Sequence, residues 1–435
     1  MTDDILAVQS KLWAIADDLR ANSNLSQANY KTPVLGVIFL RHAEQRFAEA
    51  EAELVDQSTS RRKIGKANFQ SRGVLFLRPE ARFGYLKLLP EGEDLGKALN
   101  DAMRAIEAEN EELRGVLPLN YATLGNEILI GLLRQVDELM KGLSGDAYGK
   151  VYEYFLAKFA MGEGQRGGQF FTPTPLVRLI VEIIEPHAGR ILDPASGSGG
   201  MFVQSAKFVD RHRQAKNEFL SIYGQEKESD SIQLAKMNLA VNGLAGEIAQ
   251  ANSFYEDPHK MVGAFDFVMA NPPFNVSGVD KSKIANDPRF PFGLPTSGNA
   301  NYLWVQMFYS ALNASGRAGF VMPNSAGDAR GSELELRRKV IASGAVDVIV
   351  SVSSNFFLTV TLPCTLWFLD RGKERDASKS RRVLFIDARQ VFIQLDRAHR
   401  TFSEEQLDFL ANIVRLYGHV PLSGGVSQHH AGQLF

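Results

Sequence analysis

The sequence predicts a doubly wound α/β domain over residues 145–390, preceded by a helical region. Between these bounds, short apolar segments typical of buried strands alternate with helical segments, a pattern that indicates a parallel sheet. A glycine-rich turn follows one of the first strands, and domains of this class bind ligands at the carboxyl ends of their strands. At roughly 150 residues per domain, the chain accommodates about two to three domains.

The region before the α/β domain is expected to be helical. Apolar residues recur at spacings of three and four within 5–19 and again within 129–140, as in amphipathic helices. The first stripe fits either the core of its own domain or docking on a partner chain. The basic residues between 61 and 66 fit either a solvated loop or a loop that contacts phosphate.

Seven strands are expected in the α/β region, at 190–193, 221–224, 248–250, 265–270, 319–322, 346–350 and 364–369. The sequence TPTP at 172–175 offers a helix start just before Leu176. We therefore divide the chain into an N-terminal helical domain at 1–140, an α/β domain at 141–400 and a short C-terminal tail at 401–435. The final residues, from Gly424 onward, are expected to be unstructured.

Composition narrows the class of protein. The 45% of hydrophobic and 23% of charged residues are ordinary for a soluble globular chain, and the net charge of -2 gives no global sign of nucleic-acid binding. The single cysteine, Cys364, excludes an internal disulfide and argues against a metal–thiolate cluster. There is no secretory pattern and no long apolar run, so we expect a cytoplasmic protein without a metal site or membrane contact.

The strand at 190–193 runs into the turn DPASGSGG at 193–200. A dinucleotide turn would follow Gly197 and Gly199 with a third glycine at 202, where this chain has Phe202. Asp193 would repel a pyrophosphate, but it suits a ligand that carries an ammonium group, such as the methionine end of S-adenosylmethionine. The next strand is followed by Glu226, which is placed to accept hydrogen bonds from ribose hydroxyls.

The most specific signal in the chain is the sequence NPPF at 271–274, directly after the strand at 265–270. Two consecutive prolines fix the backbone and remove two N–H donors, which leaves carbonyl acceptors unopposed. The exocyclic amine of adenine is a poor nucleophile because its lone pair is conjugated into the ring. Acceptors on the Asn271 side chain and the Pro272 carbonyl would draw the amine toward tetrahedral geometry for direct displacement at a sulfonium methyl group.

Such a reaction needs no covalent enzyme intermediate and no dedicated general base, because the methylated ammonium is itself strongly acidic. Positioning and preorganised dipoles would supply much of the rate gain. Phe274 offers a flat face on which the base can stack. Because the target atom is inaccessible inside a duplex, the base has to be flipped out.

On these two motifs the chain resembles the amino-methylating DNA methyltransferases, and more narrowly the modification subunits of type I restriction–modification systems. Further segments similar to the family are PEAR at 79–82, QFFTPT at 169–174, GNANY at 298–302, GRAG at 316–319, VMPN at 321–324, FF at 356–357 and LPCT at 362–365. The resemblance extends from the helical region to about residue 390. It implies a Rossmann-like S-adenosylmethionine-dependent methyltransferase domain in which the cofactor motifs precede the catalytic motif.

The resemblance also implies roles for individual residues. The cofactor-binding residues would be Gln169, Phe170, Phe171, Thr172, Pro173, Thr174, Asp193, Ser196, Gly197, Ser198, Gly199, Glu226 and Asn252, with Asp193 at the cofactor's amino group and Asn252 at its adenine. The catalytic pocket would be formed by Asn271, Pro272, Pro273 and Phe274. The implied partners are double-stranded DNA, a specificity subunit that binds two copies of this chain, and a restriction subunit. The family continues into further C-terminal helices, which help to hold the specificity subunit.

Two other functions remain open at this level. The same pocket suits another planar amine, such as cytosine N4, an RNA base or a protein glutamine, although asparagine at 271 favours adenine or glutamine. A subunit that binds cofactor and partner without turnover is a different class, motivated by the short C-terminal segment. An NAD-dependent oxidoreductase is disfavoured by the glycine pattern and by the segment 271–274.

Overall fold

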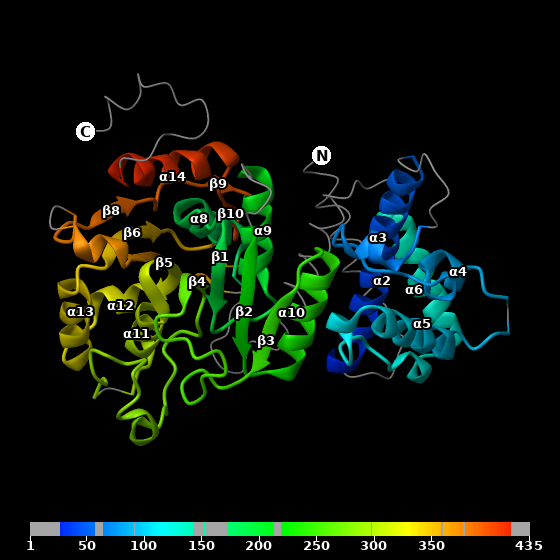
Figure 1. Ribbon diagram of the computed structural model, residues 1–435, viewed down its shortest axis with the longest axis horizontal. Helices are drawn as coiled ribbons and strands as arrows, with labels where there is room; N and C mark the ends of the chain where they lie inside the picture. Colours follow the sequence, from blue (N-terminus) through cyan, green and yellow to red (C-terminus); the bar gives the residue numbers. More distant parts are fainter. Residues whose placement is uncertain are drawn as a thin grey trace. The chain divides into compact units, whose positions relative to one another are not determined.

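The computed structural model describes residues 27–56, 64–90, 92–141, 152, 172–212, 219–296, 298–357, 360–376 and 379–418 (Figure 1). The chain forms two compact units, one comprising Met1–Gly162 with Asp230–Ala245 and the other Glu163–Ser229 with Gly246–Phe435. The predicted apolar stripe at 5–19 and the basic residues 61–63 lie outside the described residues. Among the described helices, none is both long and apolar enough to cross a bilayer.

The first unit is helical. Its described elements before residue 145 are α2 (Gln27–Asp56), α3 (Lys66–Gln70), η1 (Pro79–Ala81), α4 (Phe83–Lys87), α5 (Leu95–Glu109), η2 (Glu111–Leu113), η3 (Tyr121–Thr123) and α6 (Asn126–Met140). The predicted stripe within 129–140 is confirmed, since Leu129, Leu132, Leu133, Val136 and Met140 of α6 are all buried. Asn110 is also buried here and joins two segments through its amide, which accepts from Phe76 N and donates to Phe76 O. The apolar spacing that predicted a helical region therefore corresponds to the buried face of a helix.

One helix of the first unit comes from a distant part of the sequence. The helix α10 (Ser229–Val241) follows a strand of the second unit, yet Met237, Ala240 and Val241 belong to the same buried core as α2 and α6. Arg46 of α2 donates to the Val241 carbonyl at 3.1 Å. The chain therefore leaves the second unit after Ser229 and returns to it at Gly246.

The second unit is built on a mixed sheet. Its order is β3-β2-β1-β4-β5-β7-β6-β8, which gives eight strands within the described residues. The strands are β1 (Gly189–Asp193), β2 (Leu220–Glu226), β3 (Gly246–Gln250), β4 (Phe265–Ala270), β5 (Leu312–Pro323), β6 (Val346–Val352), β7 (Cys364–Asp370) and β8 (Leu384–Asp387). All seven predicted strands are present. A separate two-stranded sheet pairs β9 (Ile393–Gln394) with β10 (Arg400–Thr401).

The sheet departs from a purely parallel arrangement at β7. This strand lies between β5 and β6 and runs antiparallel to both. Only residues 353–363 separate β6 from β7 in the sequence. A connection of that length suits an antiparallel return better than a crossover between parallel strands. The alternation of strands and helices predicted the doubly wound class correctly, and β7 is the exception within it.

Helices cover both faces of this sheet (Figure 1). On one face, α8 packs against α9, α14 and β5, and on the other α11 packs against β4, β5 and α13. The helices and short 3-10 turns of the unit are α8 (Thr174–Ile184), α9 (Gly200–His212), η4 (Lys281–Ile284), α11 (Asn301–Ala311), α12 (Asn324–Asp328), α13 (Ser332–Ala342), η5 (Gly372–Arg375) and α14 (Glu404–Gly418). The two covered faces make this the doubly wound α/β architecture.

The helix α14 lies within the segment 401–435 that the sequence analysis treats as a tail. Its Arg415 is 5% exposed and donates to Glu185 Oε1 at 2.5 Å and to the Glu182 carbonyl at 3.3 Å, both on or next to α8. A second link, between Arg178 of α8 and Glu404 of α14, is open to solvent, since the Glu404 side chain is 73% exposed. Buried apolar residues on α14, among them Leu407 and Leu410, complete the contact.

These two links predict unequal losses of stability. Arg415→Met removes one partner of a buried ionic group, so we expect the free energy of unfolding to fall by about 3–5 kcal/mol. Arg178→Met removes an exposed ion pair and should cost about 1 kcal/mol or less. Urea denaturation of both variants would measure the difference. Equal losses in the two variants would contradict our expectation that the buried Arg415 contributes more to the attachment of α14 than the exposed Arg178 pair.

Candidate functional site

The predicted site residues gather at the carboxyl edge of the parallel strands. β1 pairs with β2 on one side and with β4 on the other, so the order of the strands reverses at β1. Such a reversal leaves a crevice beyond the strand ends, where folds of this class bind ligands. Asp193 ends β1, Glu226 ends β2 and Asn271 directly follows β4.

The glycine turn after β1 has the backbone that its sequence requires. Gly197 and Gly199 have φ values of 50° and 76°, in the left-handed region that favours glycine. A Cβ built at Gly197 would meet no atom of the described residues within 4 Å, so none of them covers the turn at this point. Ser196 anchors the turn to β2, because its backbone N donates to the Gln225 carbonyl at 3.0 Å.

Close approach of the turn to β2 depends on Gly224. A Cβ at this position would lie 2.6 Å from Ile248 Cδ1 and 3.1 Å from Ser196 Oγ, so a larger residue would push the turn away. Glu226, two residues later, is 7% exposed. Its carboxylate accepts from Gly197 N at 3.0 Å and from Lys227 N at 2.8 Å. The acidic residue predicted at the end of β2 is therefore held directly against the glycine turn.

Asp193 is a buried carboxyl group at the start of that turn. It is 2% exposed, and within the described residues its hydrogen bond comes from Ala195 N, at 3.0 Å from Oδ1. Burial raises the pKa of Asp193 to about 8, with a smaller contribution from the negative charge of Glu226, while the Ala195 bond acts in the opposite direction. A cationic group brought next to this carboxyl would favour its ionised form.

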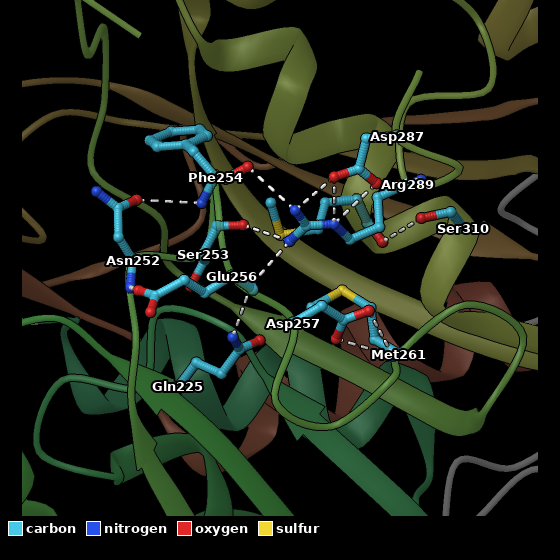
Figure 2. Close-up of polar contacts among 11 residues, drawn as sticks. Gln225, Asn252, Ser253, Phe254, Glu256, Asp257, Met261, Asp287, Arg289 and Ser310 are labelled. Carbon is cyan, nitrogen blue, oxygen red and sulfur yellow. Dashed lines mark hydrogen bonds and ion pairs between the residues drawn. The ribbon is translucent and has the colours of Figure 1, made fainter. Parts of the chain in front are cut away.

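Asn252 lies in a turn that follows β3. Its backbone N donates to Glu256 Oε2 at 2.7 Å, and its side-chain Oδ1 accepts from Phe254 N at 3.2 Å (Figure 2). The adjacent Ser253 donates from Oγ to the Pro194 carbonyl at 2.6 Å. The structure thus brings Asn252, Glu226 and the glycine turn into one hydrogen-bonded group.

The segment 271–274 emerges from β4 beside this group. Pro272 and Phe274 are buried, and the Phe274 ring meets the Phe357 ring edge-on, with 6.3 Å between centroids. Phe357 belongs to the FF segment that the resemblance singled out without assigning a contact. Two aromatic rings thus meet at the carboxyl end of β4, from segments more than 80 residues apart in the sequence.

Two asparagines fix the backbone that follows Phe274. Asn275 has a φ of 54°, and its backbone N donates to Asn301 Oδ1 at 2.9 Å while its Oδ1 accepts from Asn301 Nδ2 at 2.9 Å. Asn301 is 2% exposed and begins α11. Sequence reasoning placed GNANY in the family but gave Asn301 no role. Its spacing from Asn275 contains no pattern from which the pairing follows.

The upstream cofactor segment is described only in part. Gln169, Phe170 and Phe171 lie outside the described residues. Thr172, Pro173 and Thr174 precede or open α8, and the Pro173 carbonyl accepts from Leu176 N and Val177 N in its first turn. Packing of α8 against α9 connects these residues to the helix that follows the glycine turn.

Residues outside the predicted set also shape this region. Arg289, which the sequence analysis missed, is buried and bonds to the turn that contains Asn252 (Figure 2). Cys364 lies in β7, and burial raises the pKa of its thiol to about 12, which keeps it protonated and unreactive at neutral pH. Within the described part of the chain, no group of three or more His, Cys, Asp or Glu side chains is placed to hold a metal ion.

Family comparison agrees with this geometry. Residues 143–427 match the N-6 DNA Methylase family, and residues 8–136 match the HsdM N-terminal domain. The first match covers the glycine turn, the end of β2 and the segment 271–274 in a single family unit. The second covers the helices of the first unit up to α6.

Individual relatives agree as well. The MjaIX methylase subunit of a type I restriction enzyme from Methanocaldococcus jannaschii is 35% identical over 94% of this chain and 77% of its own length. The HindI methylase subunit from Haemophilus influenzae is 36% identical over 74% of this chain and 75% of its own length. A type I methyltransferase subunit from Streptococcus thermophilus has the same fold, with a TM-score of 0.77 at 22% identity over 95% of this chain and 93% of its own. The chain therefore belongs to the N-6 DNA methylase family and, within it, to the methylase subunits of type I restriction enzymes.

Proposed function

We propose that this chain binds S-adenosylmethionine in the crevice beyond β1 and β2, and transfers its methyl group to N6 of an adenine flipped out of double-stranded DNA. The observation that carries the proposal is the position of Asn271–Phe274, at the end of the strand next to β1. That position puts amine-binding acceptors beside the turn proposed for the cofactor.

The residues around the glycine turn fit this cofactor. None of the described residues covers the turn at Gly197, and the carboxyl groups of Asp193 and Glu226 offer acceptors to an ammonium group and to ribose hydroxyls. Asn252 and its turn would border the adenine. Thr172 to Thr174, at the start of α8, would contribute to the cofactor site, as the resemblance implies for Gln169 to Phe171. When bound, S-adenosylmethionine supplies an activated methyl group on a sulfonium.

The protein's part in the reaction is to prepare the amine. Asn271 Oδ1 and the Pro272 carbonyl would each accept a hydrogen bond from the exocyclic NH₂ group, which localises the lone pair on nitrogen. The nitrogen would then accept the methyl group directly, the methyl–sulfur bond would break with its electron pair left on a neutral thioether, and the extra proton would pass to water. Fixed acceptors of this kind act through preorganisation and positioning rather than through a covalent intermediate.

Phe274 would hold the base in place. Its buried ring is supported edge-on by Phe357, and the Asn275–Asn301 pair fixes the backbone that follows it. A ring supported in this way can stack against a flipped base without moving when the base enters. Base–aromatic stacking contributes about 1–3 kcal/mol per base.

Sequence choice would belong to other chains. We propose a specificity subunit that binds two copies of this chain and directs them to double-stranded DNA, with a restriction subunit as a further partner. The net charge of -2 on this chain supports the proposal that a partner supplies much of the positive charge that binds DNA.

The substrate class can be tested by label transfer. The purified chain, alone and with its specificity subunit, is incubated with tritiated S-adenosylmethionine and with duplex DNA, RNA or a glutamine-containing protein. We expect label in DNA, and only when the specificity subunit is present. Label in RNA or protein would support the other planar amines, and cofactor binding without any transfer would support a non-catalytic assembly subunit.

A further inference from the structure

We propose that Arg289 is a positioning residue that holds the turn at 252–256 in place for cofactor binding. The inference rests on the proposed function, because it takes the Asn252 turn as the border of the cofactor's adenine. Arg289 does not belong to that turn. It lies in the loop between the segment 271–274 and α11, so it ties the loop of the proposed catalytic pocket to the proposed cofactor site.

The Arg289 guanidinium uses all five of its N–H groups in this position (Figure 2). Its Nη1 donates to the Ser253 carbonyl at 2.7 Å and to the Glu256 carbonyl at 2.9 Å, and its Nη2 donates to the Phe254 carbonyl at 3.1 Å. The remaining donors meet Asp287, from Nε at 3.0 Å and from Nη2 at 2.6 Å. Three carbonyl groups of one turn are therefore held by a single planar group.

Asp287 fixes the orientation of that plane. Its Oδ1 also accepts from Arg289 N at 2.9 Å, which closes a compact local pair. Burial disfavours the charged form of Asp287, but the hydrogen bonds and positive charge of Arg289 outweigh it and lower the pKa of the carboxyl group. Asp287 is therefore ionised at neutral pH. Arg289 is only 3% exposed.

The held turn is linked directly to the glycine turn. Ser253, whose carbonyl Arg289 binds, donates from Oγ to the Pro194 carbonyl, the residue after Asp193. Glu256, whose carbonyl Arg289 also binds, accepts at that carbonyl from Gln225 Nε2 at 3.3 Å. Displacement of the guanidinium would thus loosen a turn that is hydrogen-bonded to Pro194, which follows β1, and to Gln225 of β2.

The turn has a second, apolar anchor that does not depend on Arg289. Phe254 is buried and packs on Trp304 of α11, with 4.7 Å between ring centroids. Loss of the guanidinium contacts should therefore loosen the turn without unfolding it. Lysine keeps the charge but has only three donors on one nitrogen, so it cannot reach three carbonyls and Asp287 in one plane.

The test is Arg289→Lys, assayed with the methylase assembled on its specificity subunit. We expect the Kd and the KM for S-adenosylmethionine to rise by about ten- to hundredfold, as for the loss of one or two charged hydrogen bonds. Because Arg289 touches no reacting atom, kcat at saturating cofactor should stay within about threefold. This split between KM and kcat separates positioning from a general loss of folded protein.

The chain offers a matched control in Arg389→Lys. Arg389 makes the same local pair with Asp387, from its backbone N and from Nε to Oδ1, and from Nη2 to Oδ2. This pair lies on the surface, with side chains 61% and 58% exposed. The control variant should bind the cofactor with wild-type affinity.

The outcomes separate this inference from the proposed function. Wild-type cofactor affinity in Arg289→Lys, with the wild-type protein binding normally, would overturn the role of Arg289 and leave the proposed function standing. A wild-type protein that binds no S-adenosylmethionine would overturn both. If Arg289→Lys does not fold, Asp287→Asn decides: a several-fold rise in Kd with unchanged kcat supports the role, and an unchanged Kd overturns it.

Discussion

Replacing Asn271 with alanine should abolish measurable DNA methylation while leaving the affinity for S-adenosylmethionine within a few-fold of wild type. The variant lacks the side-chain acceptor that would prepare the adenine amine. Loss of one preorganised hydrogen-bonding group at a reacting centre costs about 10²–10³ in kcat. In this variant the lone pair of the adenine amine also stays conjugated with the ring, so we expect kcat to fall by about 10³-fold or more. Single-turnover methylation and equilibrium cofactor binding would measure the two effects separately.

A second Asn→Ala change on the neighbouring strand provides the control. Asn313 of β5 donates from Nδ2 to Asp266 Oδ1 at 2.7 Å, at the amino end of β4, whereas Asn271 follows its carboxyl end. Asn313→Ala therefore removes an amide close to the same strand but away from the crevice. It should methylate DNA at close to the wild-type rate. An Asn271→Ala variant that also methylates at the wild-type rate would contradict the assignment of the pocket.

Asp193→Asn should weaken cofactor binding by about 10²-fold or more. The asparagine has the shape of the protonated acid but cannot provide a negative charge to the cofactor's ammonium group. Removing one partner of a buried ionic pair typically costs 3–5 kcal/mol, which sets the size of the effect. Asp408→Asn, on the exposed side of α14, is the control and should bind normally. Equal affinities for Asp193→Asn and wild type would exclude Asp193 as the counter-ion.

The same residue predicts a pH dependence. Because the pKa of Asp193 is raised to about 8, the free protein carries this group mostly neutral at pH 7, and binding of a cation has to release its proton. Cofactor affinity should therefore rise about tenfold per pH unit between pH 6 and 7, and level off near pH 8. The Asp193→Asn variant should lack this rise. Calorimetry in buffers of different ionisation enthalpy would detect the released proton, and its absence in wild type would contradict the account.

Local sequence patterns were enough to predict most strands of the fold and the two main motifs of the candidate site. Each of the seven expected strands is a short apolar run with a turn signal beside it, and such signals are read within a few residues. Gly197 and Gly199 marked the turn in the sequence because its left-handed backbone favours glycine at these two positions. The strand β7 could be found in the sequence, but its direction could not, because direction depends on how the chain returns to the sheet.

Long-range polar contacts could not be predicted in this way. Arg289 binds carbonyls more than 30 residues earlier in the chain, and the backbone groups it binds have no side-chain signature. The Asn275–Asn301 pair likewise spans 26 residues. The helix α10 packs with the N-terminal helices, which lie nearly 200 residues earlier in the chain. Because α10 stands between two strands in the sequence, the sequence alone places it in the sheet domain. Such contacts depend on the tertiary fold.

The central claim is that this chain methylates N6 of adenine in DNA, and the product nucleoside tests it most directly. The purified chain with its specificity subunit is incubated with S-adenosylmethionine and unmethylated duplex DNA, which is then digested to nucleosides and analysed by mass spectrometry. Our account predicts N6-methyladenine with the wild-type chain and none with Asn271→Ala. A product of N4-methylcytosine, or no methylated nucleoside from a complex that still binds the cofactor, would contradict it.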